Sequence, residues 1–514
     1  MKKISIISLS VLHLLIFVSL SFAQEKTNPT WNSQLQAKQV LDAGINALGG
    51  MENIRRTDKI RINYRSVNHP LGQNAAFTAP PAEFQRIGSK TLIDYSGNRY
   101  MTEGQSSSAG GYRFNFRFVI APKRSFSIDV LQNRRGNEVR NLDERATNQL
   151  KVGLLSEVPH LLLLYVAERP ETLRSLGDGE INGQKMRAIS FAAENGAQIS
   201  LYFDARTYLL ARTEQIDSHA QLGDITFGNI FSDYQTIGNI KVPRRRLAFT
   251  DQFITSENEY AEVRLDFAGG EKLLEVPAGF VEPALPQRAV NAEVMRKMGD
   301  GLYLIERIGQ SYRVMFVEFD DYVMILEAPT DSNVSKAVIK LVKQTVPDKP
   351  IKYVSFSHFH FDHTGGLREY IAEGATIVVP PGTKTFVEQI AKSKFTLKPD
   401  TLALKPQQQP LIETFETKRV FTDGKRTVEL YSIGPTSHVN DMVAFYFPKE
   451  KILFQGDMFS PLDTGGIAPI IEINHELVRK VNELKLDVET LVAVHSGAVA
   501  WKDFRQAVAD DLPR

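Results

Sequence analysis

The chain has 514 residues, of which 42% are hydrophobic and 24% are charged, a composition typical of a folded protein. This length exceeds what one hydrophobic core usually supports, so two or more domains are expected. The 61 basic and 60 acidic residues nearly cancel, which argues against nucleic acid or an anionic membrane as a partner, and the absence of cysteine excludes disulfides.

Residues 1–23 have the order of a secretory signal peptide. Lys2 and Lys3 precede an apolar stretch, and Ser21-Phe22-Ala23 forms a small-x-small cleavage site. No later run of about 18 apolar residues occurs, so the mature form is expected to lack a transmembrane segment. We therefore expect a mature protein that begins near Gln24 and is periplasmic or secreted.

Residues 24–275 are expected to form an α+β domain rich in antiparallel sheet. A helix is predicted over 34–47, and a helical section over 142–176 divides two series of strands. The predicted strands are 59–67, 91–101, 111–120 and 125–131 before the helical section, and 185–192, 198–204, 209–217, 223–237, 240–250 and 257–267 after it. The Asn-Gly pair at 195–196 is a hairpin signal within the second series.

This region weakly resembles the half-barrel of periplasmic lipoprotein-carrier proteins. The resemblance is carried by Tyr202-Phe203-Asp204, by the stretch 238–243, and by Val276-Pro277-Ala278-Gly279-Phe280. It implies that the domain binds an apolar ligand. The alternative is a scaffold that only shapes the mouth of a neighbouring active site.

A proline-marked linker is expected over 276–289, followed by a second domain over 290–514. Strands are predicted over 301–308, 313–319 and 322–326, then a helix over 332–346 and a strand over 351–356. Such alternation of strands and helices is typical of sheets covered by helices, hence an α/β domain.

The second domain contains a cluster of histidines at a strand-to-helix turn. His358, His360 and His363 lie with Asp362 within six residues, directly after the strand, and Gly365-Gly366 follows. Imidazole and carboxylate are the usual ligands of zinc and similar divalent metals. Two residues of an extended chain that are two positions apart point to the same side, which brings His358 and His360 together.

This His-x-His-x-Asp-His pattern resembles the signature of the metallo-β-lactamase superfamily, whose fold is an αβ/βα sandwich. The resemblance demands a later His, Asp and His at strand ends, and the chain supplies His438, Asp457 and His495. It implies two zinc ions per chain, with iron or manganese as alternatives. One ion would be held by His358, His360 and His438, the other by Asp362, His363 and His495, and Asp457 would bridge them.

The resemblance also implies a binuclear zinc-dependent hydrolase, in which a metal-bridging hydroxide attacks the substrate. Asp362 is the catalytic candidate, because it could orient that hydroxide and carry a proton to the leaving group. Glu327 occupies a place where many relatives have Asp, and is expected to support the site.

An ester, lactone or similar acyl compound is the expected small-molecule substrate, with no residue identified as binding it. Four alternatives remain: a phosphoester hydrolase, a β-lactamase-like enzyme, a mononuclear iron persulfide dioxygenase, and a non-catalytic periplasmic carrier. True zinc β-lactamases either use a cysteine ligand or lack the bridging Asp, which argues against that alternative. The oligomeric state is open.

Overall fold

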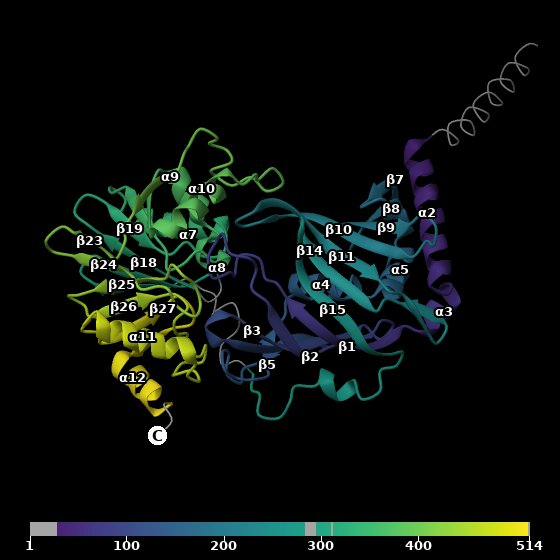
Figure 1. The fold of residues 1–514 in the computed structure, drawn as a ribbon, viewed down its shortest axis with the longest axis horizontal. Coiled ribbons are helices and arrows are strands. Elements are labelled where there is room, and N and C mark those ends of the chain that lie inside the picture. Colours follow the sequence, from purple (N-terminus) through teal and green to yellow (C-terminus); the bar gives the residue numbers. More distant parts are fainter. Residues whose placement is uncertain (1–27, 283–293, 310–311, 512–514) are drawn as a thin grey trace, which may run out of the picture.

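The computed structural model describes residues 28–282, 294–309 and 312–511. It has two lobes side by side, the N-terminal one in purple to teal and the C-terminal one in green to yellow (Figure 1). The predicted signal peptide, 1–23, lies outside the described residues, as does the end of the predicted linker from 283 onward. The start of that linker follows the N-terminal lobe, where Val281 donates its N–H to the carbonyl of Asn137.

The N-terminal lobe is built on a sheet of thirteen strands in which every pairing is antiparallel. Its order is β6-β5-β4-β3-β2-β1-β15-β14-β11-β10-β9-β8-β7, so β1 and β15 join the two series of strands. The strands are β1 (Lys59–Asn68), β2 (Phe84–Asp94), β3 (Arg99–Ser107), β4 (Arg113–Ala121), β5 (Arg124–Asp129), β6 (Arg140–Asn141), β7 (Arg174–Ile181), β8 (Gln184–Ala192), β9 (Gln198–Asp204), β10 (Leu210–His219), β11 (Gly223–Ser232), β14 (Arg245–Thr250) and β15 (Phe253–Arg264). A separate hairpin consists of β12 (Gln235–Ile237) and β13 (Ile240–Val242).

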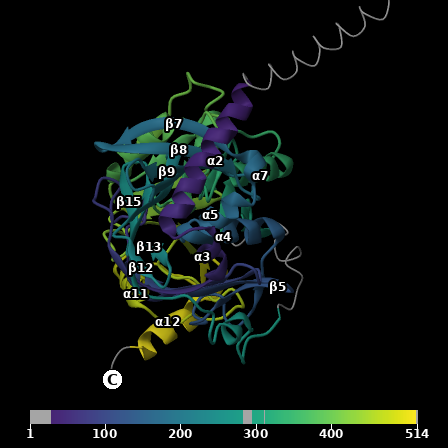
Figure 2. The same cartoon turned by 90° about the vertical axis from the view of Figure 1, so that its right-hand side faces the viewer.

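Helices cover one face of this sheet. They are α2 (Pro29–Leu48), α3 (Met51–Arg56), α4 (Glu144–Leu155) and α5 (Pro159–Ala167). The side chain of Asn28 caps the start of α2, which crosses in front of β7 to β9 in Figure 2. The four leucines at 161–164 in α5 are buried in the same core as Ile199, Leu201 and Phe203 of β9. The protein's own helices therefore occupy this face of the sheet.

No single helix among the described residues has the length and hydropathy of a membrane span. Helices α4 and α5 reach that length and hydropathy only when taken together, and the angle between them is 119°.

The predicted strand over 91–101 was wrong, because β2 and β3 form a hairpin there. Asp94 ends β2 and Arg99 begins β3, and Asn98 in the turn has a φ of 48°. Gly97 and Asn98 are turn-forming residues, but the apolar residues on both sides masked that signal.

The C-terminal lobe is a sandwich of two mixed sheets. The first has the order β16-β17-β18-β19-β20-β21-β22 and the second β23-β24-β25-β26-β27-β28. The strands are β16 (Val294–Gly299), β17 (Leu302–Ile308), β18 (Tyr312–Glu318), β19 (Val323–Leu326), β20 (Ile351–Ser355), β21 (Thr376–Val379), β22 (Leu411–Thr414), β23 (Lys418–Thr422), β24 (Thr427–Ser432), β25 (Val443–Phe447), β26 (Ile452–Gln455), β27 (Thr490–Ala493) and β28 (Ala498–Ala500). Apolar side chains from both sheets, including Met324, Phe445 and Phe454, form the core between them.

Helices cover both outer faces of the sandwich: α7, α9 and α10 on one side, α11 and α12 on the other (Figure 1). The helices are α7 (Ser332–Thr345), α8 (Phe361–Thr364), α9 (Leu367–Glu373), α10 (Lys384–Lys392), α11 (Glu472–Glu483) and α12 (Trp501–Asp510). The predicted fold class is confirmed, with an αβ/βα sandwich preceded by an antiparallel-sheet-rich domain.

The strand ends of the sandwich place the candidate ligands. Glu327 follows β19, His358 follows β20, Asp457 follows β26 and His495 follows β27. Gly365 is required after the histidine cluster, because a Cβ there would lie 2.0 Å from the carbonyl oxygen of Thr330.

Candidate metal centre

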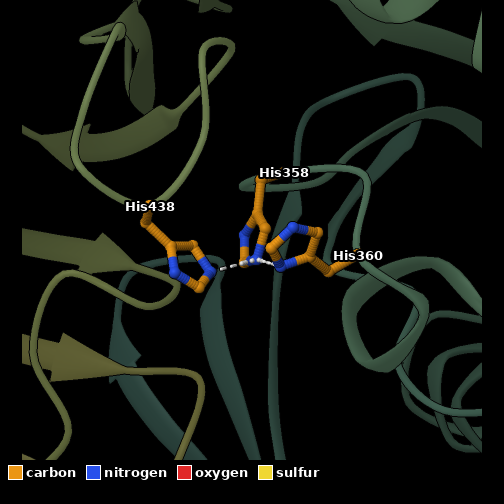
Figure 3. Close-up of side chains that lie close together, drawn as sticks. All are labelled: His358, His360 and His438. Carbon is orange, nitrogen blue, oxygen red and sulfur yellow. Dashed lines mark hydrogen bonds between the residues drawn. The ribbon is translucent and has the colours of Figure 1, made fainter. Parts of the chain in front are cut away.

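Three of the predicted ligands meet at one point. The Nε2 of His358 lies 3.1 Å from the Nδ1 of His360 and 3.2 Å from the Nε2 of His438 (Figure 3). All three side chains are buried. Three nitrogens bound to one tetrahedral zinc ion would be separated by about 3.3 Å, given Zn–N bonds of about 2.0–2.1 Å. The spacing in the structure is close to that value.

In His360 and His438, one ring nitrogen makes a hydrogen bond outside the cluster, and this bond shows that the other nitrogen faces the point where the three rings meet. The Nε2–H of His360 donates to the carbonyl of Asn74 at 3.0 Å, and the Nδ1–H of His438 donates to that of Ala109 at 3.1 Å. A carbonyl oxygen only accepts hydrogen bonds, so these two nitrogens must carry the protons. The remaining nitrogen of each ring then directs a lone pair inward. Both carbonyls belong to the N-terminal lobe.

The other four predicted ligands form a second cluster. Their donor atoms lie within 4.8 Å of one another, and the residues are Asp362, His363, Asp457 and His495. The Nε2 of His495 lies 3.3 Å from the Oδ2 of Asp362 and 3.0 Å from the Oδ1 of Asp457. The Nε2 of His363 lies 3.1 Å from the same Oδ1.

Asp457 is shared by the two clusters. Its Oδ1 faces His363 and His495, while its Oδ2 lies 3.5 Å from the Nε2 of His438. A single carboxylate therefore presents one oxygen to each group of nitrogens. All seven predicted ligands are thus brought together in two adjacent clusters.

Glu327 holds both the motif loop and one ligand, as expected. Its Oε1 accepts the N–H of Ser357 at 2.8 Å, and its Oε2 lies 3.1 Å from the Nδ1 of His363. Its side chain is fully buried and its backbone has a φ of 88°, which is uncommon for a residue other than glycine. Backbone strain of this kind is concentrated at functional positions.

The electrostatics differ between the clusters. Burial, with the neighbouring imidazoles, lowers the pKa of His358 strongly and that of His360 to about 3, so both rings are neutral. Burial also opposes a charge on His363, but the three carboxylates of Asp362, Asp457 and Glu327 raise its pKa well above the usual value.

This donor set fits divalent metal ions. In the first cluster, the lone pairs of His360 and His438 both point inward, as the ligands of a shared cation must. The second cluster contains two carboxylates, Asp362 and Asp457, whose charge a cation would offset. His358, His360 and His438 would hold one ion, and the other would be held by the second cluster.

Four residues near the centre were not predicted from the sequence. Tyr112 donates its hydroxyl to the carbonyl of Asp457 at 3.0 Å, and the ring centroid of Tyr312 lies 4.7 Å from that of His495. Gln73 donates to the Oδ1 of Asp362 at 3.4 Å. The side chain of Gln221 donates to the carbonyl of Phe359 at 2.8 Å.

Both tyrosines are held protonated. Burial raises the pKa of Tyr112 and of Tyr312, and Asp457 raises both further. The positive charge of Arg134 opposes this increase at both phenols. The other histidines of the described residues are His69, His160, His219 and His475, and they belong to neither cluster.

Residues 310–495 match the family model of the metallo-beta-lactamase superfamily. Among curated proteins, the chain is 25% identical over 129 residues to the alkyl/aryl-sulfatase BDS1 of Saccharomyces cerevisiae, covering 22% of this chain and 19% of that protein. It is 23% identical over 231 residues to the 2,4-dinitroanisole O-demethylase subunit alpha of a Nocardioides species, covering 45% of this chain and 63% of that protein. The chain thus spans less than two thirds of the length of either relative.

Among solved structures, the metallo-beta-lactamase from Pontibacter korlensis is 17% identical and aligns with 42% of this chain and 98% of its own, with a TM-score of 0.32. The rubredoxin oxygen:oxidoreductase of Desulfovibrio gigas is 15% identical and aligns with 42% of this chain and 60% of its own, with a TM-score of 0.33. On the match of the family model to residues 310–495, the C-terminal half of this chain carries the fold of the metallo-β-lactamase superfamily, most of whose members are metal-dependent hydrolases.

Proposed function

We propose that this protein is an exported hydrolase that uses two divalent metal ions, with zinc as the expected metal, to cleave an ester, lactone or related acyl substrate. The observation that carries the proposal is the position of Asp457, whose Oδ1 and Oδ2 face different clusters. A carboxylate in that position partly neutralises two neighbouring dications. A site for one ion alone would not need the complete second cluster.

When bound, two such ions make a water molecule nucleophilic at neutral pH and offset the charge that develops on the substrate oxygen. The residues of the chain supply orientation and proton transfer. Burial alone would raise the pKa of Asp362, but His363 and His495 hold it below its ordinary value, so the carboxylate is ionised. The ionised oxygen can accept a hydrogen bond from the attacking water and so orient it, and we propose that Asp362 also carries a proton to the leaving group.

The N-terminal lobe supports the centre by fixing ring orientations. Hydrogen bonds from His360 to Asn74 and from His438 to Ala109 keep two imidazoles in the tautomer that a metal requires. Gln73 and Tyr112, also in the N-terminal lobe, contact the side chain of Asp362 and the main-chain carbonyl of Asp457. The loops of the N-terminal lobe thus help to exclude bulk water from the centre, which strengthens its electrostatic interactions.

The curated relatives favour a second candidate substrate class. One is named for sulfatase activity on alkyl and aryl compounds, and the other for O-demethylation of an anisole. Each name describes cleavage at an oxygen that joins a carbon skeleton to a second group. We therefore include alkyl and aryl sulfate esters beside carboxylic esters and lactones.

The test begins with metal content, measured by mass spectrometry on the purified mature protein. We expect two zinc ions per chain, and hydrolysis that is lost on chelation and restored by zinc. The panel comprises an aryl ester, a lactone, an aryl sulfate, a phosphodiester and a β-lactam. One iron per chain, with oxygen uptake in the presence of a persulfide and no hydrolysis, would instead establish the dioxygenase alternative. Residues 1–23 still attached to protein from the native host would contradict export.

A further inference from the structure

A hairpin of the N-terminal lobe reaches the loop that carries the histidine motif. Its tip, residues 219–224 between β10 and β11, lies against the segment that follows α10. The N–H of Asp224 donates to the carbonyl of Lys394 at 2.7 Å, and the hydroxyl of Ser393 donates to the carbonyl of Gln221 at 2.7 Å. A Cβ on Gly223 would lie 2.1 Å from the carbonyl oxygen of Lys394. Contacts to its main chain therefore hold the hairpin tip against the C-terminal lobe.

The side chain of Gln221 extends from the hairpin tip into the motif loop. It is buried, and its Nε2 lies 2.8 Å from the carbonyl oxygen of Phe359 and 2.8 Å from the hydroxyl oxygen of Thr364. A carbonyl oxygen only accepts hydrogen bonds, so the NH₂ of the amide, rather than its oxygen, must face the loop. The two protons of that NH₂ match the two acceptors.

These contacts hold the peptide units on both sides of His360. The carbonyl of Phe359 belongs to the peptide that precedes His360, and the carbonyl of His360 to the one that follows. The hydroxyl of Thr364 lies 2.9 Å from the carbonyl oxygen of His360 and 3.0 Å from that of Phe359. Because Gln221 already donates to Phe359, the single proton of Thr364 is better used by His360. The two peptide planes together set the direction in which the His360 side chain leaves the main chain.

We propose that Gln221 is a positioning residue of the metal centre, which fixes the main chain of His360 while the carbonyl of Asn74 fixes its ring. The inference rests on the metal centre of the proposed function. A ligand whose main chain and ring are both held loses little freedom when it binds an ion, which raises the affinity. Without Gln221, the buried carbonyl of Phe359 would lose this donor and the loop would relax. The N-terminal lobe thus positions His360 through two separate loops.

The binding test measures zinc affinity of the full chain by competition with a chelator. Gln221→Met keeps nearly the same length but removes both donors. It should lower the affinity for one of two zinc equivalents by about tenfold and leave the other as in the wild type. The control is Asp224→Ala on the same hairpin tip, since Asp224 accepts the N–H of Thr396 at 2.7 Å and that of Leu397 at 3.1 Å. It should lose stability and keep both zinc affinities.

A second measurement needs no metal. Hydrogen–deuterium exchange of the metal-free protein reports how firmly each loop is held. Gln221→Met should exchange faster over residues 359–364, whereas Asp224→Ala should exchange faster over residues 393–397. Equal exchange over 359–364 in the wild type and Gln221→Met would show that the side chain does not hold the motif loop.

A double-mutant cycle tests the path through Thr364. Thr364→Val removes the hydroxyl with little change of shape and should also weaken zinc binding. Gln221→Met and Thr364→Val together should cost less affinity than the sum of the single losses, because both interrupt the same connection to His360. Additive losses would contradict a shared path.

The outcomes separate this inference from the proposed function. Wild-type zinc affinities in Gln221→Met would overturn the positioning role, and so would an equal loss in Asp224→Ala, which would assign the effect to docking of the hairpin tip. If Gln221→Met alone loses affinity but the zinc-loaded wild type hydrolyses no substrate of the panel, the hydrolase is wrong and the positioning role remains. If zinc-dependent hydrolysis is found and Gln221→Met binds zinc as the wild type does, the reverse holds. A wild type that binds no zinc would overturn both.

Discussion

The imidazole of His360 and the main-chain carbonyl of Asn74 lie 3.0 Å apart although 286 positions separate them in the chain. The contact crosses between the two lobes and decides which nitrogen of His360 faces the metal position. His438 is fixed in the same way by Ala109. The first cluster is therefore completed by the N-terminal lobe, although its three candidate ligands all belong to the C-terminal lobe.

Gly110→Ala should weaken metal binding at the first cluster. Gly110 has a φ of 82°, and a Cβ there would lie 3.3 Å from Ile473 and 3.5 Å from the Nδ1 of His438. The substitution would strain the turn that presents the carbonyl of Ala109. Loss of an outer hydrogen bond to a ligand typically lowers metal affinity by about 10–100-fold, and we expect a decrease at the lower end, measured by competition with a chelator.

The matched control is Gly183→Ala. Gly183 has a φ of 80° but faces open space, far from the centre in the β7–β8 turn. Both substitutions carry the same backbone cost of about 1–2 kcal/mol, so both should lower the unfolding midpoint. Equal chelator affinity in the two variants would contradict a role of the Ala109 carbonyl.

Glu327→Gln should reduce occupancy of the second cluster. The amide oxygen can still accept from Ser357, but the amide NH₂ would then face the Nδ1 of His363. That nitrogen would have to accept, and the proton would move to Nε2, which faces Asp457. We expect about tenfold or greater loss of affinity for one of two zinc equivalents, measured by calorimetric titration of metal-free protein.

Glu369→Gln serves as the comparison, because Glu369 is another buried glutamate of the same lobe. It accepts the N–H of Thr401 at 3.1 Å and pairs with Lys336, away from both clusters. This variant should lose stability and keep both zinc equivalents. If Glu327→Gln binds both zinc equivalents with the affinities of the wild type, the carboxylate of Glu327 serves only to hold the loop at Ser357.

The convergence of the seven candidate ligands was predictable because each lies in a recognisable local pattern after a short apolar strand. The contributions of Asn74 and Ala109 were not, because a main-chain carbonyl carries no signal of residue type. Tyr112 begins a stretch, 112–118, with an aromatic residue at every second position. The sequence did not show that the hydroxyl of Tyr112 would reach the candidate metal centre. Contacts between lobes depend on how the lobes dock, which local periodicity does not encode.

Asp457→Ala should reduce the metal content from two ions to one. The change removes the charge that offsets repulsion between two dications, while the three imidazoles of the first cluster are retained. Most of the hydrolytic rate should be lost with the second ion. Asp320→Ala is the control, since Asp320 pairs with Lys425 at the protein surface and belongs to neither cluster. Two ions and full esterase activity in Asp457→Ala would refute the two-metal mechanism.

The last prediction concerns the stability of the N-terminal lobe in acid. His160 in α5 is buried, and its Nε2 donates to the carbonyl of Thr57 at 3.2 Å. Burial lowers its pKa to about 4, against about 6.5 in an unfolded chain. Well above pH 6.5 the ring is neutral in both the folded protein and the unfolded chain, so it does not change the free energy of unfolding.

Between pH 6.5 and 4 the unfolded chain binds a proton that the folded protein does not, so stability falls as the pH falls. The loss should approach about 3 kcal/mol near pH 4. His160→Gln retains an N–H donor for Thr57 but does not titrate, so its stability should fall less over this range. Urea unfolding at pH 7 and pH 4.5, with His475→Gln on the partly exposed face of α11 as the control, measures the difference. If wild type and His160→Gln lose the same free energy between these two pH values, the buried imidazole does not cause the acid sensitivity.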